Sequence, residues 1–180
     1  ANEFDTKARE TFSLNFPHVQ LDGRDIREVS ASKVPTVDVI VGGFPCQAFS
    51  IEGYRQGFCD EKGRGTLFFE LARIIEEKQP QAIFLENVKN LVNHDKGNTF
   101  KVILTTLEEL GYFVTYQVMN AAEYGNIPQG RERIYIVGFK DKGAFERFTF
   151  PQKLDLTTSV FDVIDFKNLV EEQYYYREDK

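Results

Sequence analysis

The stretch "VDVIVGGFPCQAFS", residues 37–50, decides the fold class of this chain. It opens with an apolar run over 37–41, which is typical of a strand buried in a parallel sheet. The run stops at Gly42 and Gly43, and a proline and Cys46 follow almost at once. Because ligands in open α/β sheets bind outside the carboxyl ends of the strands, this cysteine is a candidate functional residue.

Helical and strand-like patterns alternate along the rest of the chain. Apolar residues at helical spacing predict helices over 5–16, 66–78 and 98–110. Asp5 is the expected N-cap of the first helix, and Gly111 is the expected C-cap of the last. Short apolar runs predict strands over 18–21, 37–41, 81–85, 112–119 and 133–139. This alternation predicts an α/β fold with a mostly parallel central sheet.

Length and composition limit the class of protein. The chain has 180 residues, 42% of them hydrophobic, which is enough for one compact domain with its own core. No apolar run is long enough for a membrane helix, and the first residues lack the features of a signal peptide, so we expect a cytoplasmic protein with no membrane partner. The net charge of −6 argues against a large nucleic-acid-binding surface within these residues.

The cysteines and histidines indicate no metal site. Cys46 and Cys59 are the only cysteines of the sequence, and His18 and His94 are its only histidines. They form no CxxC pair, so neither a zinc site nor a disulfide framework is expected. A disulfide between Cys46 and Cys59 stays open as an alternative, although a reducing compartment disfavours it.

Several reactive or charged side chains stand near the expected strand ends. Taken singly, a cysteine is usually a small core residue and a glutamate a solvated surface charge. Together with Arg131 and Arg133, Cys46 and Glu86 form a set with a chemical use. Arginines favour the thiolate, which attacks electron-poor carbon, and a desolvated glutamic acid can protonate a ring nitrogen.

Six segments resemble, in order and spacing, the motifs of the DNA (cytosine-5) methyltransferases. Three are similar to the catalytic motifs of that family: "GGFPCQAFS" at 42–50, "ENVKNL" at 86–91 and "QGRERIYIVGF" at 129–139. Three are similar to its cofactor-binding segments: "NEFDTKA" at 2–8, "GRDIREV" at 23–29 and "GTLFFELARII" at 65–75. The resemblance implies a Rossmann-like methyltransferase domain that uses S-adenosyl-L-methionine and no metal.

The resemblance assigns roles to the catalytic residues. Cys46 would add to carbon 6 of a cytosine flipped out of double-stranded DNA, so that carbon 5 can accept the methyl group. Glu86 would contact ring nitrogen 3 and the exocyclic amine, while Arg133 would contact the carbonyl oxygen of the base. Four further residues would support the site: Pro45 by stiffening the loop, Asn87 by bracing it, and Arg131 and Gln129 as part of the same motif.

The cofactor residues carry over in the same way. Glu3 would bind the ribose hydroxyls, and Phe4 would stack on the adenine. Asp25 would accept from the adenine amino group, with Ile26 lining the same pocket. Leu67 matches an apolar residue near the cofactor. For Phe4 and Leu67 a plain core role is an open alternative, because such side chains are common in cores.

The chain departs from the family pattern at both ends. The Phe-x-Gly-x-Gly turn expected before Glu3 is absent, as is most of a target recognition domain after residue 150. We therefore interpret 1–150 as a partial catalytic domain, incomplete at its N-terminus, and 151–180 as the lead into the recognition domain. The chain would be a fragment, one half of a split enzyme with a complementary chain, or one piece of a longer chain.

Three functions are consistent with these residues. The first is a DNA (cytosine-5) methyltransferase of restriction-modification type. Its DNA-contacting surface would lie mostly in the absent recognition domain, so the negative net charge of these residues does not argue against DNA binding by the whole enzyme. The second is a methyltransferase acting on cytosine in tRNA with the same site. The third is a catalytically silent binding or assembly fragment. We expect the isolated fragment to be inactive in any case.

Overall fold

The computed structural model describes residues 1–45, 67–165 and 171. They divide into two compact units, each described by itself below. The first unit comprises Ala1–Val118 and Arg133–Phe150. The second comprises Met119–Glu132 and Pro151–Lys180.

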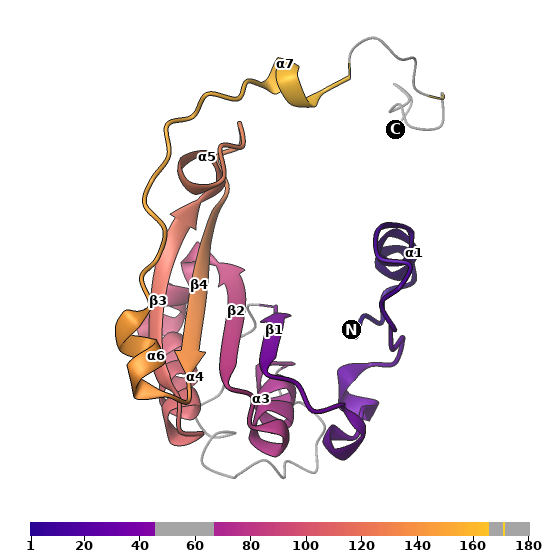
Figure 1. The fold of residues 1–180 in the computed structure, drawn as a ribbon, viewed down its shortest axis with the longest axis vertical. Coiled ribbons are helices and arrows are strands. Elements are labelled where there is room, and N and C mark those ends of the chain that lie inside the picture. Colours follow the sequence, from indigo (N-terminus) through magenta and orange to yellow (C-terminus); the bar gives the residue numbers. More distant parts are fainter. Residues whose placement is uncertain (46–66, 166–170, 172–180) are drawn as a thin grey trace. The chain divides into compact units, whose positions relative to one another are not determined.

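A four-stranded sheet is the centre of the fold. Its strands are β1 (Val39–Gly43), β2 (Ala82–Val88), β3 (Phe113–Asn120) and β4 (Glu132–Phe139), in the spatial order β1-β2-β4-β3. The β1 and β2 strands are parallel, whereas β2 and β4 are antiparallel. Figure 1 shows that β4 runs against the other three strands. The predicted α/β class is thus confirmed, with a mixed sheet in which one strand is reversed.

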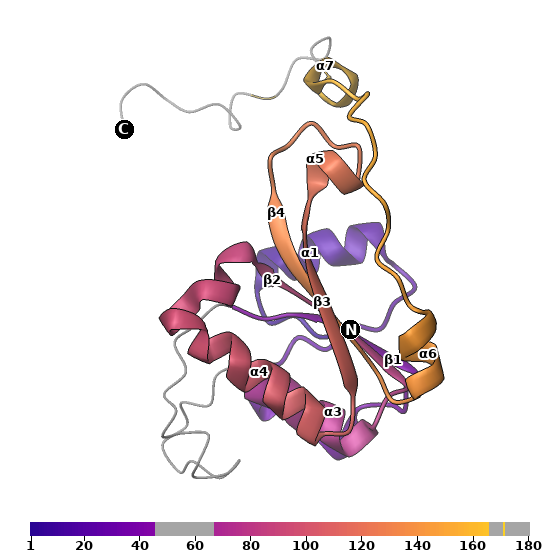
Figure 2. The same ribbon diagram turned by 90° about the vertical axis from the view of Figure 1, so that its left-hand side faces the viewer.

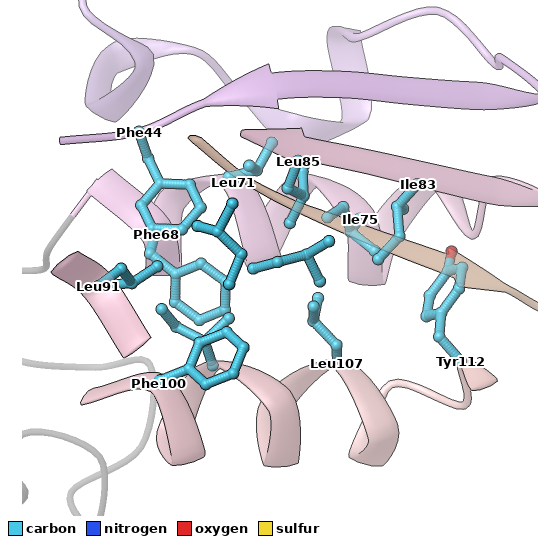
Figure 3. Close-up of a cluster of buried hydrophobic side chains, with 13 residues drawn as sticks. Phe44, Phe68, Leu71, Ile75, Ile83, Leu85, Leu91, Phe100, Leu107 and Tyr112 are labelled. Carbon is cyan, nitrogen blue, oxygen red and sulfur yellow. The ribbon is translucent and has the colours of Figure 1, made fainter. Parts of the chain in front are cut away.

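Two amphipathic helices, α3 (Leu67–Lys78) and α4 (Asn98–Glu109), cover one face of this sheet (Figure 2). Alternate residues of a strand point to opposite faces, so β2 turns Ile83 and Leu85 toward the helices. Both side chains are fully buried. Figure 3 shows them meeting aromatic and aliphatic side chains of the two helices, among them Phe68, Ile75, Phe100 and Leu107. Burying each such side chain stabilises the fold by roughly 1.5–3 kcal/mol.

Gly42 is placed by this packing. It lies on the helix-covered face of β1, opposite Leu85 of β2. A Cβ atom added there would come within 3.1 Å of the Leu71 side chain of α3. The glycine therefore allows α3 to approach the carboxyl end of β1, where the candidate site begins.

The first helix is confirmed, and the strand predicted after it is wrong. Helix α1 (Thr6–Asn15) begins after Asp5, whose carboxylate accepts a hydrogen bond from the Ala8 amide at 2.8 Å. Residues 18–21 form turns and bends instead of a strand. Val19 is 46% exposed, so this segment has no covered face that would favour a strand. Strand-like pairing is limited to an isolated bridge between Asn2 and Asp22.

The predicted end of the next strand is also corrected. We expected a strand over 81–85 that stops before Glu86, but β2 continues through Val88. The ladder with β4 extends over these residues, because Glu86 lies opposite Tyr135 and Val88 lies opposite Arg133. The helix predicted over 98–110 agrees with α4, and Gly111 just beyond it has the positive φ of 86° that favours glycine.

Short elements complete the described chain. Within the first unit lie three 3-10 helices, η1 (Ile26–Glu28), η2 (Ala31–Lys33) and η3 (Lys89–Gly97), and helix α6 (Lys142–Arg147). The second unit holds α5 (Ala121–Tyr124) and α7 (Val160–Val163). Across the residues placed by the structure, no helix has the length and apolar character needed to cross a membrane.

Candidate active site

The backbone that leads into Cys46 is anchored to β2. Cys46 itself lies outside the described residues, whose first range ends at Pro45. The preceding Phe44 is buried, and its ring packs against that of Phe68 with 5.2 Å between centroids. The Phe44 carbonyl accepts a hydrogen bond of 2.7 Å from the Asn87 side-chain amide.

Asn87 is the buried polar residue behind this anchor. Its side chain is only 2% exposed, and it lies on the helix-covered face of β2. The amide nitrogen donates to Phe44, and the amide oxygen accepts from the backbone N–H of Val88 at 2.8 Å. Both ends of the side chain are therefore used, as burial of an amide requires. The arrangement fixes where the chain leaves β1.

An ion pair occupies the opposite face of the same strand ends. The Glu86 Oε1 atom lies 2.9 Å from Nε of Arg133, and both side chains are half-buried. Arg133 is directly opposite Val88 in the ladder, so it reaches Glu86 along the diagonal of the antiparallel pair. On the other side, Gly43 of β1 pairs with Glu86, and an added Cβ would lie 3.4 Å from Oε2.

This geometry combines a carboxylate, a guanidinium and a strand end. One oxygen of Glu86 is held by Arg133, and the other faces the small residue Gly43. Charge-assisted hydrogen bonds of this kind fix the orientation of both groups. The face around the pair also carries Tyr135, whose ring stacks on that of Phe84 with 5.6 Å between centroids. A planar polar ligand could bind here through hydrogen bonds to the ion pair and through contact with the Tyr135 ring.

Two predicted site residues lie in the second unit. Gln129 and Arg131 are both exposed, in the loop between α5 and β4. The Arg131 N–H donates to the Gln129 carbonyl at 2.9 Å, and the Arg131 carbonyl accepts from the Ala121 N–H at 3.0 Å. The structure thus brings Glu86, Asn87 and Arg133 together in the first unit, while these two residues belong to the other one.

The N-terminal residues predicted to bind the cofactor are accessible. Glu3 accepts a hydrogen bond from the Asp5 N–H at 2.8 Å, and its own N–H donates to the Asp22 carbonyl at 3.0 Å. The Phe4 ring is 62% exposed, which is unlike a core side chain. Leu67, the first residue of α3, is half-buried.

Asp25 has a well-defined environment. It is the N-cap of η1, where its Oδ1 atom accepts from the Arg27 N–H at 2.9 Å. Its Oδ2 atom is 2.5 Å from Nη2 of Arg27. Hydrogen bonds from Arg27 lower the pKa of Asp25 to about 2, so the carboxylate is a charged acceptor at neutral pH. Ile26 follows it and is half-buried.

Chemically, these groups fit an adenosine-containing ligand. Carboxylates such as those of Glu3 and Asp25 accept from ribose hydroxyls and from an adenine amino group. The exposed Phe4 ring provides a flat apolar surface. Among the described residues no group of three or more histidine, cysteine or acidic side chains is placed to hold a metal ion.

The known protein family with the description C-5 cytosine-specific DNA methylase matches residues 1–180. The chain belongs to this family. The type II methyltransferase M.Bsp6I of Bacillus sp. (strain RFL6) is 52% identical over 180 residues, which cover 100% of this chain and 56% of that protein. M.HhaI of Haemophilus parahaemolyticus is 46% identical over 164 residues, or 91% of this chain and 49% of the relative. The chain therefore spans about half the length of these methylases.

Solved structures support the methylase fold. DNMT2 of Spodoptera frugiperda aligns with a TM-score of 0.70 at 22% identity, over 96% of this chain and 53% of that one. The methyltransferase EhMeth of Entamoeba histolytica aligns with a TM-score of 0.63 at 17% identity, over 98% and 53% of the two chains. At such low identity these likenesses concern the fold alone.

Two residues of the candidate site were not predicted from the sequence. Phe44 buries the start of the Pro-Cys segment, and Tyr135 lies directly opposite Glu86 in the sheet. Strand alternation contains the signal for Tyr135, because residues two apart share a face and Arg133 is two positions before it. The same alternation contains the signal for Phe44, because it lies two positions after Gly42 and so continues the helix-covered face of β1.

Proposed function

We propose that this protein is a DNA (cytosine-5) methyltransferase of restriction-modification type. Its membership of the C-5 cytosine-specific DNA methylase family supports the reaction, and the names of the type II relatives support the biological setting. The observation that carries the proposal is local. The Glu86–Arg133 ion pair and the Asn87–Phe44 anchor stand where the chain enters Cys46.

In the proposed reaction the Cys46 thiolate adds to carbon 6 of the cytosine, which makes carbon 5 nucleophilic. S-adenosyl-L-methionine, when bound, supplies the methyl group that carbon 5 takes up. Transfer of the carbon 5 proton to water and cleavage of the carbon 6–sulfur bond would then restore the aromatic ring, so that Cys46 leaves as a thiolate. The target base must be flipped out of double-stranded DNA, because carbon 6 is out of reach within the stack.

Glu86 and Arg133 would recognise the flipped base. Glu86, as the carboxylic acid, would donate a hydrogen bond to ring nitrogen 3 and accept one from the exocyclic amine, and the bond at nitrogen 3 would make carbon 6 more electrophilic. Arg133 would donate to the carbonyl oxygen of the base while it holds Glu86 in place. Their ion pair of 2.9 Å supports this joint role, since one oriented pair would meet one edge of the ring.

The other predicted residues would position these groups. Pro45 limits the backbone freedom beside the nucleophile, because its ring fixes φ. Asn87 would hold the same segment through the Phe44 carbonyl, and the hydrogen bond of 2.7 Å supports this role. Arg131 and Gln129 are proposed as supporting residues because they belong to the same sequence motif as Arg133.

The cofactor would be bound by Glu3, Phe4, Asp25, Ile26 and Leu67. Glu3 would bind the ribose, Phe4 would stack on the adenine, and Asp25 would accept from the adenine amine. Ile26 and Leu67 would line the pocket. Support comes from the exposed Phe4 ring and from Asp25, a carboxylate whose pKa of about 2 keeps it charged. No metal takes part in the proposed reaction.

The proposed partner is double-stranded DNA, and the recognition of its sequence would lie in a part of the protein outside these residues. Such an enzyme would work in the bacterial cytoplasm or in association with the nucleoid. The net charge of −6 fits a catalytic segment that leaves most phosphate contacts to that other part.

A methyl-transfer assay with the complete protein tests the proposal. Duplex DNA and tRNA are offered separately with radiolabelled cofactor, and the product nucleoside is identified by mass spectrometry. The proposal predicts 5-methylcytosine in the DNA alone. Label in tRNA alone would favour the RNA methyltransferase, and transfer to neither substrate would favour the silent binding module.

A further inference from the structure

The segment that carries Asp25 and Ile26 is held against α3 by hydrogen bonds from a basic side chain. Nη2 of Arg73 donates to the Val29 carbonyl at 2.9 Å and lies 3.3 Å from the Ile26 carbonyl. These two carbonyls bracket η1, because Ile26 is its first residue and Val29 its C-cap. One guanidinium therefore spans the whole 3-10 turn. The Val29 side chain itself is buried, at 7% exposed.

The guanidinium is itself held in place. Glu70, one turn earlier on α3, accepts from Nε of Arg73 at 2.9 Å and lies 2.9 Å from Nη2. Arginine presents several N–H groups in one rigid plane, so it can bind a carboxylate and two carbonyls at once. A lysine in the same place would keep the charge, but its ammonium group lacks the planar array of N–H donors and would not bind all three acceptors at once.

The direction of the Asp25 carboxylate follows from this attachment. Asp25 is tied to its own turn by the Arg27 N–H and by the Arg27 side chain. Its orientation is therefore set by the backbone of η1, and the position of that backbone relative to α3 is set by Arg73. Since Leu67 is also on α3, the same link fixes the spacing between Asp25, Ile26 and Leu67.

We propose that Arg73 is a positioning residue for cofactor binding, which holds Asp25 and Ile26 at a fixed distance from Leu67. The inference rests on the proposed function, because it takes these three residues to surround the adenosine part of S-adenosyl-L-methionine. Arg73 does not touch the ligand in this scheme. It acts through the two carbonyls of η1, so its loss should weaken binding and leave the chemistry of the base untouched.

Lys78 offers a matched control on the same helix. Its Nζ atom donates to the Ser32 carbonyl at 3.0 Å, beyond η1. Removing Lys78 therefore also deletes one cation and one carbonyl contact from α3, but it leaves the Ile26 and Val29 carbonyls bound. A difference between the two variants isolates the effect on η1.

The experiment compares wild type, Arg73→Ala, Arg73→Lys and Lys78→Ala in the complete protein. Calorimetry gives Kd for S-adenosyl-L-methionine and for S-adenosylhomocysteine, and steady-state assays give KM and kcat. We expect Arg73→Ala to raise both Kd values and KM about tenfold, with kcat within about twofold of wild type. Arg73→Lys should fall between, and Lys78→Ala should stay within about twofold on every measure.

The results that would overturn the inference are specific. They are an unchanged Kd in Arg73→Ala, an equal loss in Lys78→Ala, or a fall in kcat as large as the rise in KM. If Arg73→Ala does not fold, Arg73→Lys carries the test by the same criteria. An Asp25→Asn variant separates the two proposals. If its affinity for the cofactor is unchanged, the proposed cofactor site is refuted. If its affinity is weaker while the Arg73 variants bind the cofactor as wild type does, only the positioning role of Arg73 is refuted.

Discussion

Replacing Asn87 by alanine should destabilise the protein by about 1–4 kcal/mol, because the change leaves a buried carbonyl without a hydrogen-bond donor. The Phe44 carbonyl would lose its donor at 2.7 Å in a place where Asn87 is 2% exposed and water has little access. An unsatisfied buried acceptor costs about 1–3 kcal/mol, and the lost bond to the Val88 N–H adds up to about 1 kcal/mol. Asn87→Asp should cost more, since a buried carboxylate would face the carbonyl oxygen without a proton to donate.

Urea denaturation followed by circular dichroism gives these differences, with Asn90→Ala as the control. Asn90 lies three positions along in the chain and is exposed, so its loss should change the unfolding free energy by less than about 0.5 kcal/mol. The expected order of cost is Asn90→Ala, then Asn87→Ala, then Asn87→Asp. If Asn87→Ala were as stable as Asn90→Ala, the reasoning that this amide anchors the Pro-Cys segment would be refuted.

Three further changes have defined outcomes. Glu86→Gln should slow methyl transfer and leave the cofactor Kd unchanged in calorimetry, and a loss confined to cofactor affinity would place Glu86 on the wrong ligand. Gly42→Ala should cost about 1–2 kcal/mol in urea denaturation, because the new Cβ would lie 3.1 Å from the Leu71 side chain. Gly130→Ala, with nothing within 4 Å of its added Cβ, is the control, and equal costs would contradict the packing argument. The pKa of Asp25 is lowered from 3.8 to about 2, so its stabilising effect is present above pH 4 and is lost as the pH falls toward 2. Denaturation at pH 5 and pH 3 should therefore show a smaller pH dependence in Asp25→Asn than in wild type, and identical profiles would exclude the effect.

The helices and the approximate positions of four strands could be predicted because their patterns are local, although β1 lies at Val39–Gly43, two residues later than the predicted 37–41. The apolar faces of α3 and α4 repeat at helical spacing, and Asp5 provides an N-cap that the structure uses. The end of β2 could not be predicted in the same way. Glu86 is polar and ends the apolar run, yet the ladder to β4 continues through Val88. The prediction of a strand over 18–21 was wrong, because a short apolar run does not show whether a neighbouring strand is available for pairing.

The sequence proposes the residues of the candidate site as a set, but it does not predict their geometry. The reversed direction of β4 leaves no trace in its alternation, since a period of two reads the same both ways. That direction places Arg133 diagonal to Glu86 and lets the two form an ion pair. The role of Arg73 could not be predicted either. Its hydrogen-bond partners are backbone carbonyls more than forty positions away, and every residue type has such a carbonyl, so the sequence does not mark them.

Covalent capture of the base tests the proposed chemistry most directly. The complete protein is incubated with S-adenosyl-L-methionine and a DNA duplex carrying 5-fluorocytosine, whose fluorine blocks the loss of a proton from carbon 5. The thiol adduct should then persist through denaturing gels, and mass spectrometry of the digest should map it to Cys46. Cys59→Ser should form the adduct as wild type does, and Cys46→Ser should form none. An adduct on Cys59, or none in the wild-type protein while 5-methylcytosine is still made, would contradict the role of Cys46 as the nucleophile.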